Sequence, residues 1–456
     1  MKTRKRRIEF FSFYNHTGIE AHFTEMANKG WLIESISNLY WTYRRIEPKN
    51  IHFCVTYYPR ASDFDPGPSE EQQTFHDFCA HTGWKLACAW HQMQVFYNEK
   101  EAPIPLETDP IMEVDTLHRA CKKNYLPSYY FLLAISILIG GYSLAGIYFV
   151  PIDYLSSSSR MITGLAYLCM LVDSAVELIN YFIWHRRAIK EAQNGIFVDT
   201  PSTVKIQKFI VMILMLGVVW WFANLIAGDD PLLLWIAVVM SVCFFIIIFL
   251  VNGIKQKLKK AKTSRGVNRF LTLAACAVLP MILISAVVYI GITAVRNDWI
   301  RANSDATSLP LLVSDFYDVD DDDYIQQNSS SQTFLMGHRN VHLYGNWDID
   351  GGGELPDLKY SITTVKLPLL YDWCKDQMYR DMDESEDGDI PAGHRNVLKP
   401  EDASEWSAVE VYRVYNEEGW WLNRYLICYE DRVVDIRFDW EPTAEDMAIV
   451  SQKLNP

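Results

Sequence analysis

Five long apolar segments constrain the fold of this 456-residue chain more than any other feature of its sequence. Each is close to the roughly 20 residues that a helix needs to cross about 30 Å of hydrocarbon. They lie at 129–150, 161–184, 208–227, 232–251 and 270–293. Runs this long, this poor in charge and repeated five times are rarely core helices of a soluble protein. The pattern therefore predicts a multi-pass α-helical membrane protein, with the lipid bilayer as its first partner.

The lysines and arginines of the connecting loops predict the orientation of these segments. The loop 185–208 carries five cations, and the loop 252–269 carries seven cations and no acid. The alternate connections contain a single arginine at 151–160 and an acidic pair at 229–230. The positive-inside rule then places the N-terminus in the cytoplasm and the C-terminus outside the cell membrane.

The net charge of −14 conceals an uneven distribution along the chain. Residues 297–456 contain 33 acidic and 13 basic side chains, whereas the rest of the chain contains 23 and 29. An acidic outer domain and a basic cytoplasmic side do not suit a nucleic-acid binder, so no nucleic-acid partner is expected.

Residues 1–109 show an alternation of strand and helix patterns. The strand patterns are "RIEFFSFY", "WLIESISNLYWTYRRIEP", "IHFCVTYYP" and "WKLACAWHQMQVFY". Capping boxes at Thr17–Glu20 and Ser69–Gln72 predict two helices, which end at Gly30 and Gly83. The order strand, helix, strand, strand, helix, strand predicts a cytoplasmic α+β domain of the ferredoxin-like type.

The remaining boundaries follow from composition. We expect a connecting amphipathic helix at 110–128, the membrane segments within 129–294, a tether at 295–309 and an acidic extracytoplasmic α+β domain at 310–456. In the last domain, "WSAVEVYRVYN", "WWLNRYLICYE" and "RVVDIRFDW" alternate as strands, and a helix begins at Thr443.

Exposed aromatic residues on a ferredoxin-like sheet can stack RNA bases, and Phe53, Tyr57 and Tyr97 are the candidates here. No strand carries the K/R-G-F-G-F-V-F pattern, and alternating aromatic residues usually belong to a core. We therefore favour a protein-docking or small-ligand surface on this domain.

Four segments of the N-terminal region resemble, in the same order, the bacterial domain of unknown function 2812. They are "GIEAHFTEMANKGWLIESI", "YWTYRRIEP", "FCVTYYPRASDFDP" and "TGWKLACAWHQMQVFYNE", within the first quarter of the chain. Members of that family stand at the N-terminus of membrane proteins that are often encoded beside PadR-type transcriptional regulators. The resemblance implies a regulated bacterial membrane protein, and it assigns no catalytic residue.

Motifs of common enzyme and cofactor sites are absent from the sequence. There is no phosphate-binding loop, dinucleotide fingerprint, H-E-x-x-H or G-x-S-x-G, and the nine cysteines show no C-x-x-C spacing. The acidic stretch Asp318–Asp323 lacks both the glycine and the glutamate of a calcium loop, and Asp348–Glu354 lacks the glutamate, so solvated loops are the better interpretation. We expect no catalytic residue, no cofactor and no metal.

Cys374 and Cys428 are the two cysteines that the topology places outside. They either form a disulfide or remain as two buried thiols, and the sequence leaves both open.

The segment "LVDSAVELINYFIW" carries Asp173, Glu177 and Asn180 on one helix face within the second apolar run. Insertion of an acid at the helix centre costs about 2.5–3.5 kcal/mol, so both acids need compensation. No lysine or arginine lies centrally in another segment, and Asn224 is the clearest polar candidate. The hypothesis is that this stripe faces the bundle interior and senses a proton, an ion or a partner. The alternative is that it only holds helices together.

Together these patterns favour a non-enzymatic membrane sensor or regulatory protein that relays an outside or intramembrane event to a protein partner of the cytoplasmic domain. The alternative is a transporter, or a transporter subunit, that uses the intramembrane acidic pair. Transport folds are typically built from repeats, which five segments do not supply in one chain. Homo-oligomerisation is left open.

Overall fold

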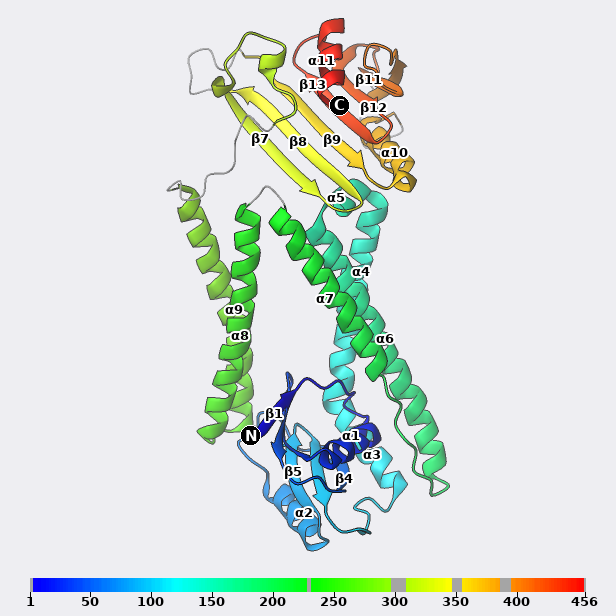
Figure 1. Ribbon diagram of the computed structural model, residues 1–456, viewed down its shortest axis with the longest axis vertical. Coiled ribbons are helices and arrows are strands. Elements are labelled where there is room, and N and C mark those ends of the chain that lie inside the picture. Colours follow the sequence, from blue (N-terminus) through cyan, green and yellow to red (C-terminus); the bar gives the residue numbers. More distant parts are fainter. Residues whose placement is uncertain (1–2, 228–230, 297–308, 347–354, 386–394, 455–456) are drawn as a thin grey trace. The chain divides into compact units, whose positions relative to one another are not determined.

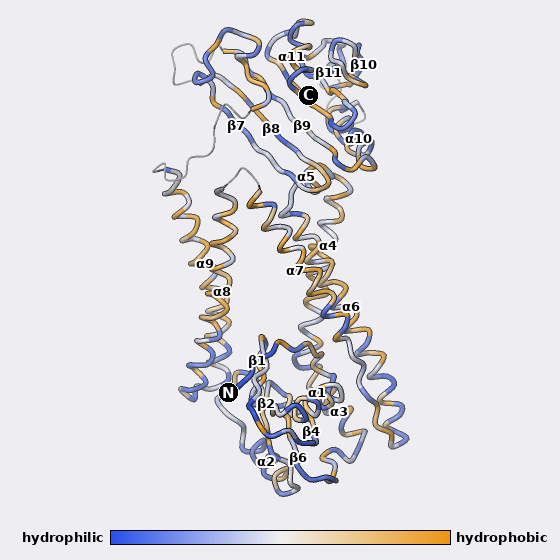
Figure 2. Tube along the Cα trace, in the orientation of Figure 1, coloured by the Kyte–Doolittle hydropathy of each residue, from blue (hydrophilic) through white to orange (hydrophobic). Residues whose placement is uncertain are grey.

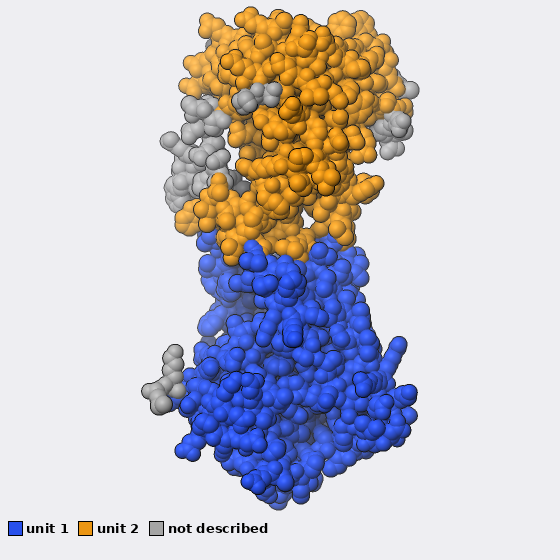
Figure 3. Space-filling view, turned by 45° about the vertical axis from the view of Figure 1, so that its right-hand side comes forward, with its two compact units in different colours: residues 1–140, 166–216, 237–291 blue, residues 141–165, 217–236, 292–456 orange. Residues whose placement is uncertain are grey.

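The computed structural model describes residues 3–227, 231–296, 309–346, 355–385 and 395–454. Most of the predicted tether at 295–309 and the acidic stretch at 348–354 lie outside these residues. The chain divides into two compact units (Figure 3). Unit 1 contains 1–140, 166–216 and 237–291, and unit 2 contains 141–165, 217–236 and 292–456.

Within the described residues, five helices are long and apolar enough to cross a membrane, by length and composition, as the sequence predicts (Figure 2). They are α4 (Leu126–Phe149), α6 (Ser158–Ala192), α7 (Val204–Ala227), α8 (Pro231–Lys260) and α9 (Arg265–Arg296) (Figure 1). Helix α6 continues beyond the apolar run that ends at Trp184. Its last turns pack Ala188 and Ala192 into the core of the N-terminal domain.

The N-terminal domain has two three-stranded antiparallel sheets, ordered β1-β3-β2 and β4-β6-β5. Its elements are β1 (Arg4–Arg7), α1 (His16–Asn28), β2 (Trp31–Ile36), β3 (Trp41–Arg45), β4 (His52–Tyr57), α2 (Glu70–His81), β5 (Lys85–Trp90) and β6 (Met93–Asn98). Each sheet is thus one β-α-β-β unit, and the second unit repeats the topology of the first.

The structure does not have the predicted ferredoxin-like order, which needs a single sheet built from β-α-β-β-α-β. Two runs that the sequence pattern indicates as continuous are hairpins. One turns at His91, whose φ of 51° is left-handed, and the other turns at Ser37–Tyr40, where the Ser37 hydroxyl donates to the Tyr40 carbonyl. Neither turn carries the glycine that usually marks one.

The start of α1 also differs from the prediction, because tertiary contacts use the side chains of the expected capping box. Asn15 caps the helix and accepts a 3.0 Å hydrogen bond from Gly18 N. Thr17 instead contacts Thr200, and Glu20 accepts a bond from the backbone N–H of β4. The predicted cap of α2 is confirmed, since Ser69 Oγ accepts from Gln72 N.

The core of this domain extends into the long helices. Helix α3 (Pro110–Ala120) leads through a π-helical turn, η1 (Cys121–Tyr125), into α4. Buried Leu117 and Tyr125 from this stretch join Tyr181 and Trp184 of α6 in the same cluster. Phe53, Tyr57 and Tyr97 are also buried, so they do not form a base-stacking surface.

The C-terminal domain is built on a seven-stranded antiparallel sheet in the order β10-β11-β12-β13-β9-β8-β7. Its strands are β7 (Tyr324–Gln332), β8 (Met336–Gly345), β9 (Leu358–Val365), β10 (Asn396–Glu401), β11 (Glu410–Asn416), β12 (Trp421–Cys428) and β13 (Arg432–Phe438). Short 3-10 turns lie at η3 (Val313–Asp315), η4 (Asp321–Asp323) and η6 (Pro368–Leu370). The three strand patterns recognised in the sequence are confirmed as β11, β12 and β13.

Helices cover both faces of this sheet. On one face, α11 (Ala444–Leu454) packs through Val450 against Ile436 and its neighbours. On the other face, α10 (Tyr371–Met382) packs through Met378 against Val433. The short helix α5 (Pro151–Ser156), which connects α4 to α6, packs through Leu155 on that second face, beside Met336. The loop between the first two long helices is therefore part of the C-terminal domain's core.

Candidate functional site

The carboxylate of Glu177, in α6, is fully buried in unit 1. Its Oε1 accepts hydrogen bonds from Ser12 Oγ at 2.9 Å, from Gln207 Nε2 at 2.8 Å and from the Thr203 hydroxyl. Its Oε2 accepts a 2.6 Å hydrogen bond from the Tyr125 hydroxyl. One carboxylate thus accepts hydrogen bonds from three other segments of unit 1.

These donors come from segments that are far apart in the sequence. Ser12 precedes α1, Tyr125 ends the π-helical turn, and Thr203 and Gln207 stand at the start of α7. A π-helical turn inside a longer helix is frequent at functional sites. The Ser12 and Thr203 hydroxyls also lie 2.8 Å apart, so the cluster is continuous.

A second set of polar contacts holds the same segments together. Thr200 Oγ1 donates to Asn15 Oδ1 at 2.9 Å, and Thr200 N donates to Thr17 Oγ1 at 3.1 Å. The connection between α6 and α7 is therefore bound to the residues around the start of α1. We call the residues Ser12, Tyr125, Glu177, Thr203 and Gln207 the Glu177 cluster.

Hydrogen bonds, rather than a counter-ion, compensate the burial of this carboxylate. All four of its donors are neutral groups. Moving a carboxylate out of water costs several kcal/mol unless new partners replace its hydration. If α6 separated from the segment around Ser12, the acid and its donors would lose partners at once. The cluster therefore ties the position of the N-terminal domain to that of α6.

The structure separates the three residues of the predicted polar stripe. Asp173 is half-buried, and Asn180 donates at 2.8 Å to Val176 O of its own helix. Asn224, the expected partner, likewise donates to Trp220 O within α7. Glu177 accepts hydrogen bonds from the segment before α1, from the π-helical turn before α4 and from the start of α7. Ser12 and Thr203 were missed because a single hydroxyl beside an apolar run carries no recognisable motif.

A second ionisable cluster lies between α1, β4 and α3. His16 Nε2 is 2.7 Å from Glu113 Oε1. Glu20 Oε1 accepts from Val55 N at 2.7 Å, and the Thr56 hydroxyl donates to Glu107. Burial raises the pKa of Glu20 to about 7 and also raises the pKa of Glu107. Burial alone would lower the pKa of His16, but the hydrogen bond and charge of Glu113 raise it above its ordinary value.

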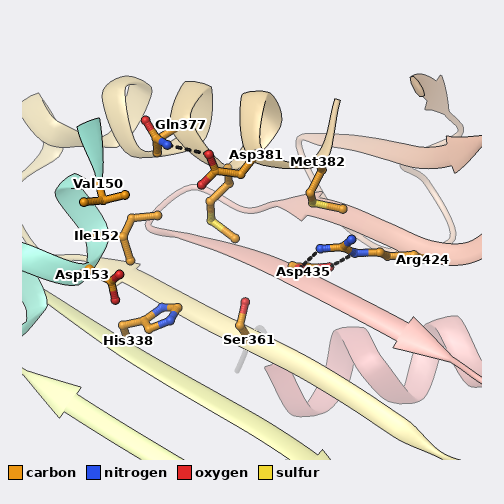
Figure 4. A pocket seen from close by; sticks show the side chains of 11 residues that line it. Val150, Ile152, Asp153, His338, Ser361, Gln377, Asp381, Met382, Arg424 and Asp435 are labelled. Atoms are coloured by element: carbon orange, nitrogen blue, oxygen red, sulfur yellow. Dashed lines mark hydrogen bonds and ion pairs between the residues drawn. The ribbon is translucent and has the colours of Figure 1, made fainter. Parts of the chain in front are cut away.

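Unit 2 contains a cavity of about 200 Å³ between the sheet, α5 and α10 (Figure 4). Its lining residues are Val150, Ile152, Asp153, His338, Ser361, Gln377, Met378, Asp381, Met382, Arg424 and Asp435. Asp153 and His338 lie near one another, whereas Arg424 and Asp435 form an ion pair in another part of the cavity (Figure 4). Burial lowers the pKa of His338 despite the nearby charge of Asp153, so its imidazole is neutral at pH 7.

The sequence did not single out any residue of this cavity. His338 Nδ1 lies 2.9 Å from Thr363 Oγ1, and the His338 side chain is half-buried. The cavity residues come from six separate stretches of the chain, so only the fold brings them together. In the described part of the chain, no three His, Cys, Asp or Glu side chains are grouped as a metal site.

Cys374 and Cys428 are both free thiols in the structure, and both are buried. Cys374 packs beside Leu155 and Met336, whereas Cys428 packs beside Leu426 and Met378. The disulfide left open by the sequence is thus not formed, because each thiol fills a different hydrophobic cluster.

Comparison with known proteins agrees with the resemblance seen in the sequence. No curated protein and no solved structure shows significant similarity to the chain. Residues 15–129, which include α1, the strands β2 to β6 and the Tyr125 donor, match the model of the family described as "Protein of unknown function (DUF2812)".

Proposed function

We propose that the chain is a non-enzymatic sensor or regulatory protein of the bacterial cell membrane. In this proposal the five apolar helices span the bilayer, the N-terminal domain lies in the cytoplasm and the C-terminal domain lies outside. An event at the C-terminal domain or within the membrane alters the N-terminal domain, which passes the change to a protein partner. The family resemblance adds that a PadR-type regulator encoded nearby controls its production.

The Glu177 cluster is the observation that carries this proposal. A rigid anchor would need only apolar packing, which Tyr181 and Trp184 already supply. The added carboxylate makes the contact directional, because each of its donors is lost when one segment shifts by an ångström or two. A small displacement of α6 is thereby converted into release or reorientation of the segment around Ser12.

Contacts at α5 supply the input in this proposal. Thr333 Oγ1 donates to Leu155 O at 2.6 Å, and the Ser331 and Ser156 hydroxyls lie 3.0 Å apart. Helices α4 and α6, which flank α5 in sequence, each contribute residues to both compact units. A change in the C-terminal domain that moves α5 therefore acts on α6, which carries Glu177, and on α4, which directly follows Tyr125 in the chain.

Hydrogen exchange of the full-length protein in lipid nanodiscs tests the relay. Thr333→Val removes the hydroxyl that holds α5 and should speed amide exchange in residues 8–15. Thr443→Val removes a hydroxyl from the cap of α11 and serves as the matched control, which should leave residues 8–15 unchanged. Equal exchange at residues 8–15 in the wild type and Thr333→Val would refute the relay.

Reporter fusions test the proposed orientation. Fusions after Lys190 and Lys260 should report the cytoplasm, and a fusion after Arg301 should report the outside. A cytoplasmic signal after Arg301 would contradict five crossings.

Transport remains the second candidate because Asp173 lies one helical turn from Glu177 and is only half-buried. Proteoliposomes that contain a pH-sensitive dye distinguish the two functions. A proton flux that Asp173→Asn abolishes would favour transport over sensing.

A further inference from the structure

The lining of the cavity in unit 2 contains more acidic than basic side chains. Its lining contains three carboxylates, from Asp153, Asp381 and Asp435, and one guanidinium, from Arg424. Arg424 is already engaged by Asp435 through two hydrogen bonds of 2.9 and 2.8 Å. Because the His338 imidazole is neutral at pH 7, two negative charges on the wall lack a cation within the lining.

The contacts of these two carboxylates leave room for a ligand. Asp381 accepts one hydrogen bond of 2.6 Å, from the neutral amide of Gln377. Asp153 approaches Arg160 at 3.6 Å, and the two side chains are 61% and 47% exposed, so water screens this pair strongly. Asp153 and Asp381 come from α5 and α10, which places them on two sides of the same space (Figure 4).

Four apolar side chains also line the cavity. Val150 and Ile152 contribute from the α5 side, and Met378 and Met382 contribute from α10. Methionine side chains adapt to ligands of varied shape. The volume of about 200 Å³ lies below the roughly 300–1,000 Å³ of sites for drug-sized ligands, which limits the occupant to the size of a small metabolite.

We propose that this cavity binds a small organic cation that joins a primary ammonium group to a short alkyl chain. Asp153 and Asp381 bind the ammonium group, and Ile152, Met378 and Met382 contact the chain. Since Asp153 belongs to α5, occupation of the cavity pulls on the connection between α4 and α6. The proposed binding is inferred from the cavity alone. The role of this cation as the signal rests on the function proposed above.

Calorimetric titration of the purified full-length protein in zwitterionic nanodiscs tests the proposal, with hexylammonium as the probe. Hexanol and hexanoate have the same chain without the positive charge. We expect hexylammonium to bind at least ten-fold more tightly than either. Asp153→Asn and Asp381→Asn should each weaken its binding about ten-fold. Asp376→Asn, an exposed acid of α10 outside the lining, is the matched control and should leave the affinity unchanged.

Two outcomes would overturn the proposal. One is hexanoate or hexanol binding as tightly as hexylammonium. The other is an affinity for hexylammonium that neither Asp153→Asn nor Asp381→Asn reduces, which would show partition into the lipid instead of binding in the cavity. Hydrogen exchange at residues 8–15 separates this inference from the relay: specific binding without a change there would refute the relay and leave the cavity assigned.

Discussion

Ser12 Oγ donates a 2.9 Å hydrogen bond to Glu177 Oε1, although the two residues are 165 positions apart in the chain. The bond joins the irregular segment before α1 to an ionisable group inside a long apolar helix. Because Ser12 is as deeply buried as its acceptor, water cannot replace either partner without opening the domain.

Substitutions of Glu177 should have graded effects. In Glu177→Gln the amide oxygen can still accept from Ser12 and Gln207, and the Tyr125 hydroxyl can turn to accept from the new amide group. We expect a loss of about 1 kcal/mol in the free energy of unfolding. Glu177→Ala removes the acceptor that the four donors share in a largely buried space, so the loss should reach about 3 kcal/mol or more.

Unfolding of the full-length protein in detergent measures both variants, with Asp173→Ala as the matched control. Asp173 lies on the same helix, and removing its half-buried carboxylate should change the stability by less than about 1 kcal/mol. Equal destabilisation by Asp173→Ala and Glu177→Ala would show that the cluster contributes nothing specific.

The contact of α3 with the N-terminal domain should weaken as the pH rises from 6 to 8.5. The raised pKa of Glu20, about 7, means that the folded state holds this proton above the ordinary value of 4.5. The stabilisation is therefore complete below pH 4.5 and is lost as the pH rises through 7. His16 acts in the same direction, since its raised pKa makes the ion pair with Glu113 complete below pH 6.5 and lost at higher pH.

The melting temperature of the full-length protein against pH measures this effect. Between pH 6 and 8.5 the shift of Glu20 corresponds to about 1 kcal/mol, because the rest of its effect falls below pH 6. Glu20→Gln stays neutral at every pH and can still accept from Val55 N, so it should remove most of the slope. A wild-type stability that rises between pH 6 and 8.5 would contradict the assignment.

The sequence predicted the parts of the fold that depend on long, regular patterns. Apolar runs of twenty residues identify α4 and α6 to α9, and period-two alternation identifies β11 to β13. The N-terminal topology was missed because its hairpins turn at His91 and at Ser37–Tyr40, where no glycine interrupts the strand pattern. A local turn of this kind is fixed by pairing with neighbouring strands, which sequence periodicity does not record.

The sequence predicted the carboxylate of the candidate site but not its hydrogen-bond donors. A carboxylate in an apolar helix is conspicuous, and Glu177 was found for that reason. Its donors were not, since Ser12 and Thr203 are ordinary polar residues until the fold buries them around the acid. Helix geometry alone led to the expectation that Asp173 shares the role of Glu177. The sequence pattern does not show that the N-terminal segment covers one turn of α6.

Cys374 and Cys428 should both remain reduced and slow to react. Burial raises the pKa of Cys374 to about 11 and that of Cys428 to about 12, so neither forms a thiolate at neutral pH. Iodoacetamide should label neither residue in the folded protein and both after unfolding without a reducing agent. A disulfide-linked peptide in the non-reduced digest would contradict the structure.

The loop between β4 and α2 should control the turn that joins α8 to α9. Asp63 accepts a 2.6 Å hydrogen bond from Lys255, and Asp65 binds Arg265 at 2.5 and 2.8 Å. Asn268 adds a 3.1 Å hydrogen bond to the carbonyl of Phe64. These contacts join α8 and α9, whose apolar side chains are largely exposed, to the N-terminal domain.

Asp63→Asn together with Asp65→Asn should therefore free this turn, and trypsin should cut after Lys262 about ten-fold faster in the double variant. Lys262 lies in the turn with a left-handed φ of 55°, so an extended conformation that fits a protease requires local opening. Salt at 0.5 M should produce part of the same effect in the wild type, because it screens the partly exposed pairs. Asp77→Asn in α2 removes an exposed acid and should leave the cleavage rate unchanged. If Asp77→Asn accelerates cleavage as much as the double variant, net charge rather than these ion pairs holds the turn.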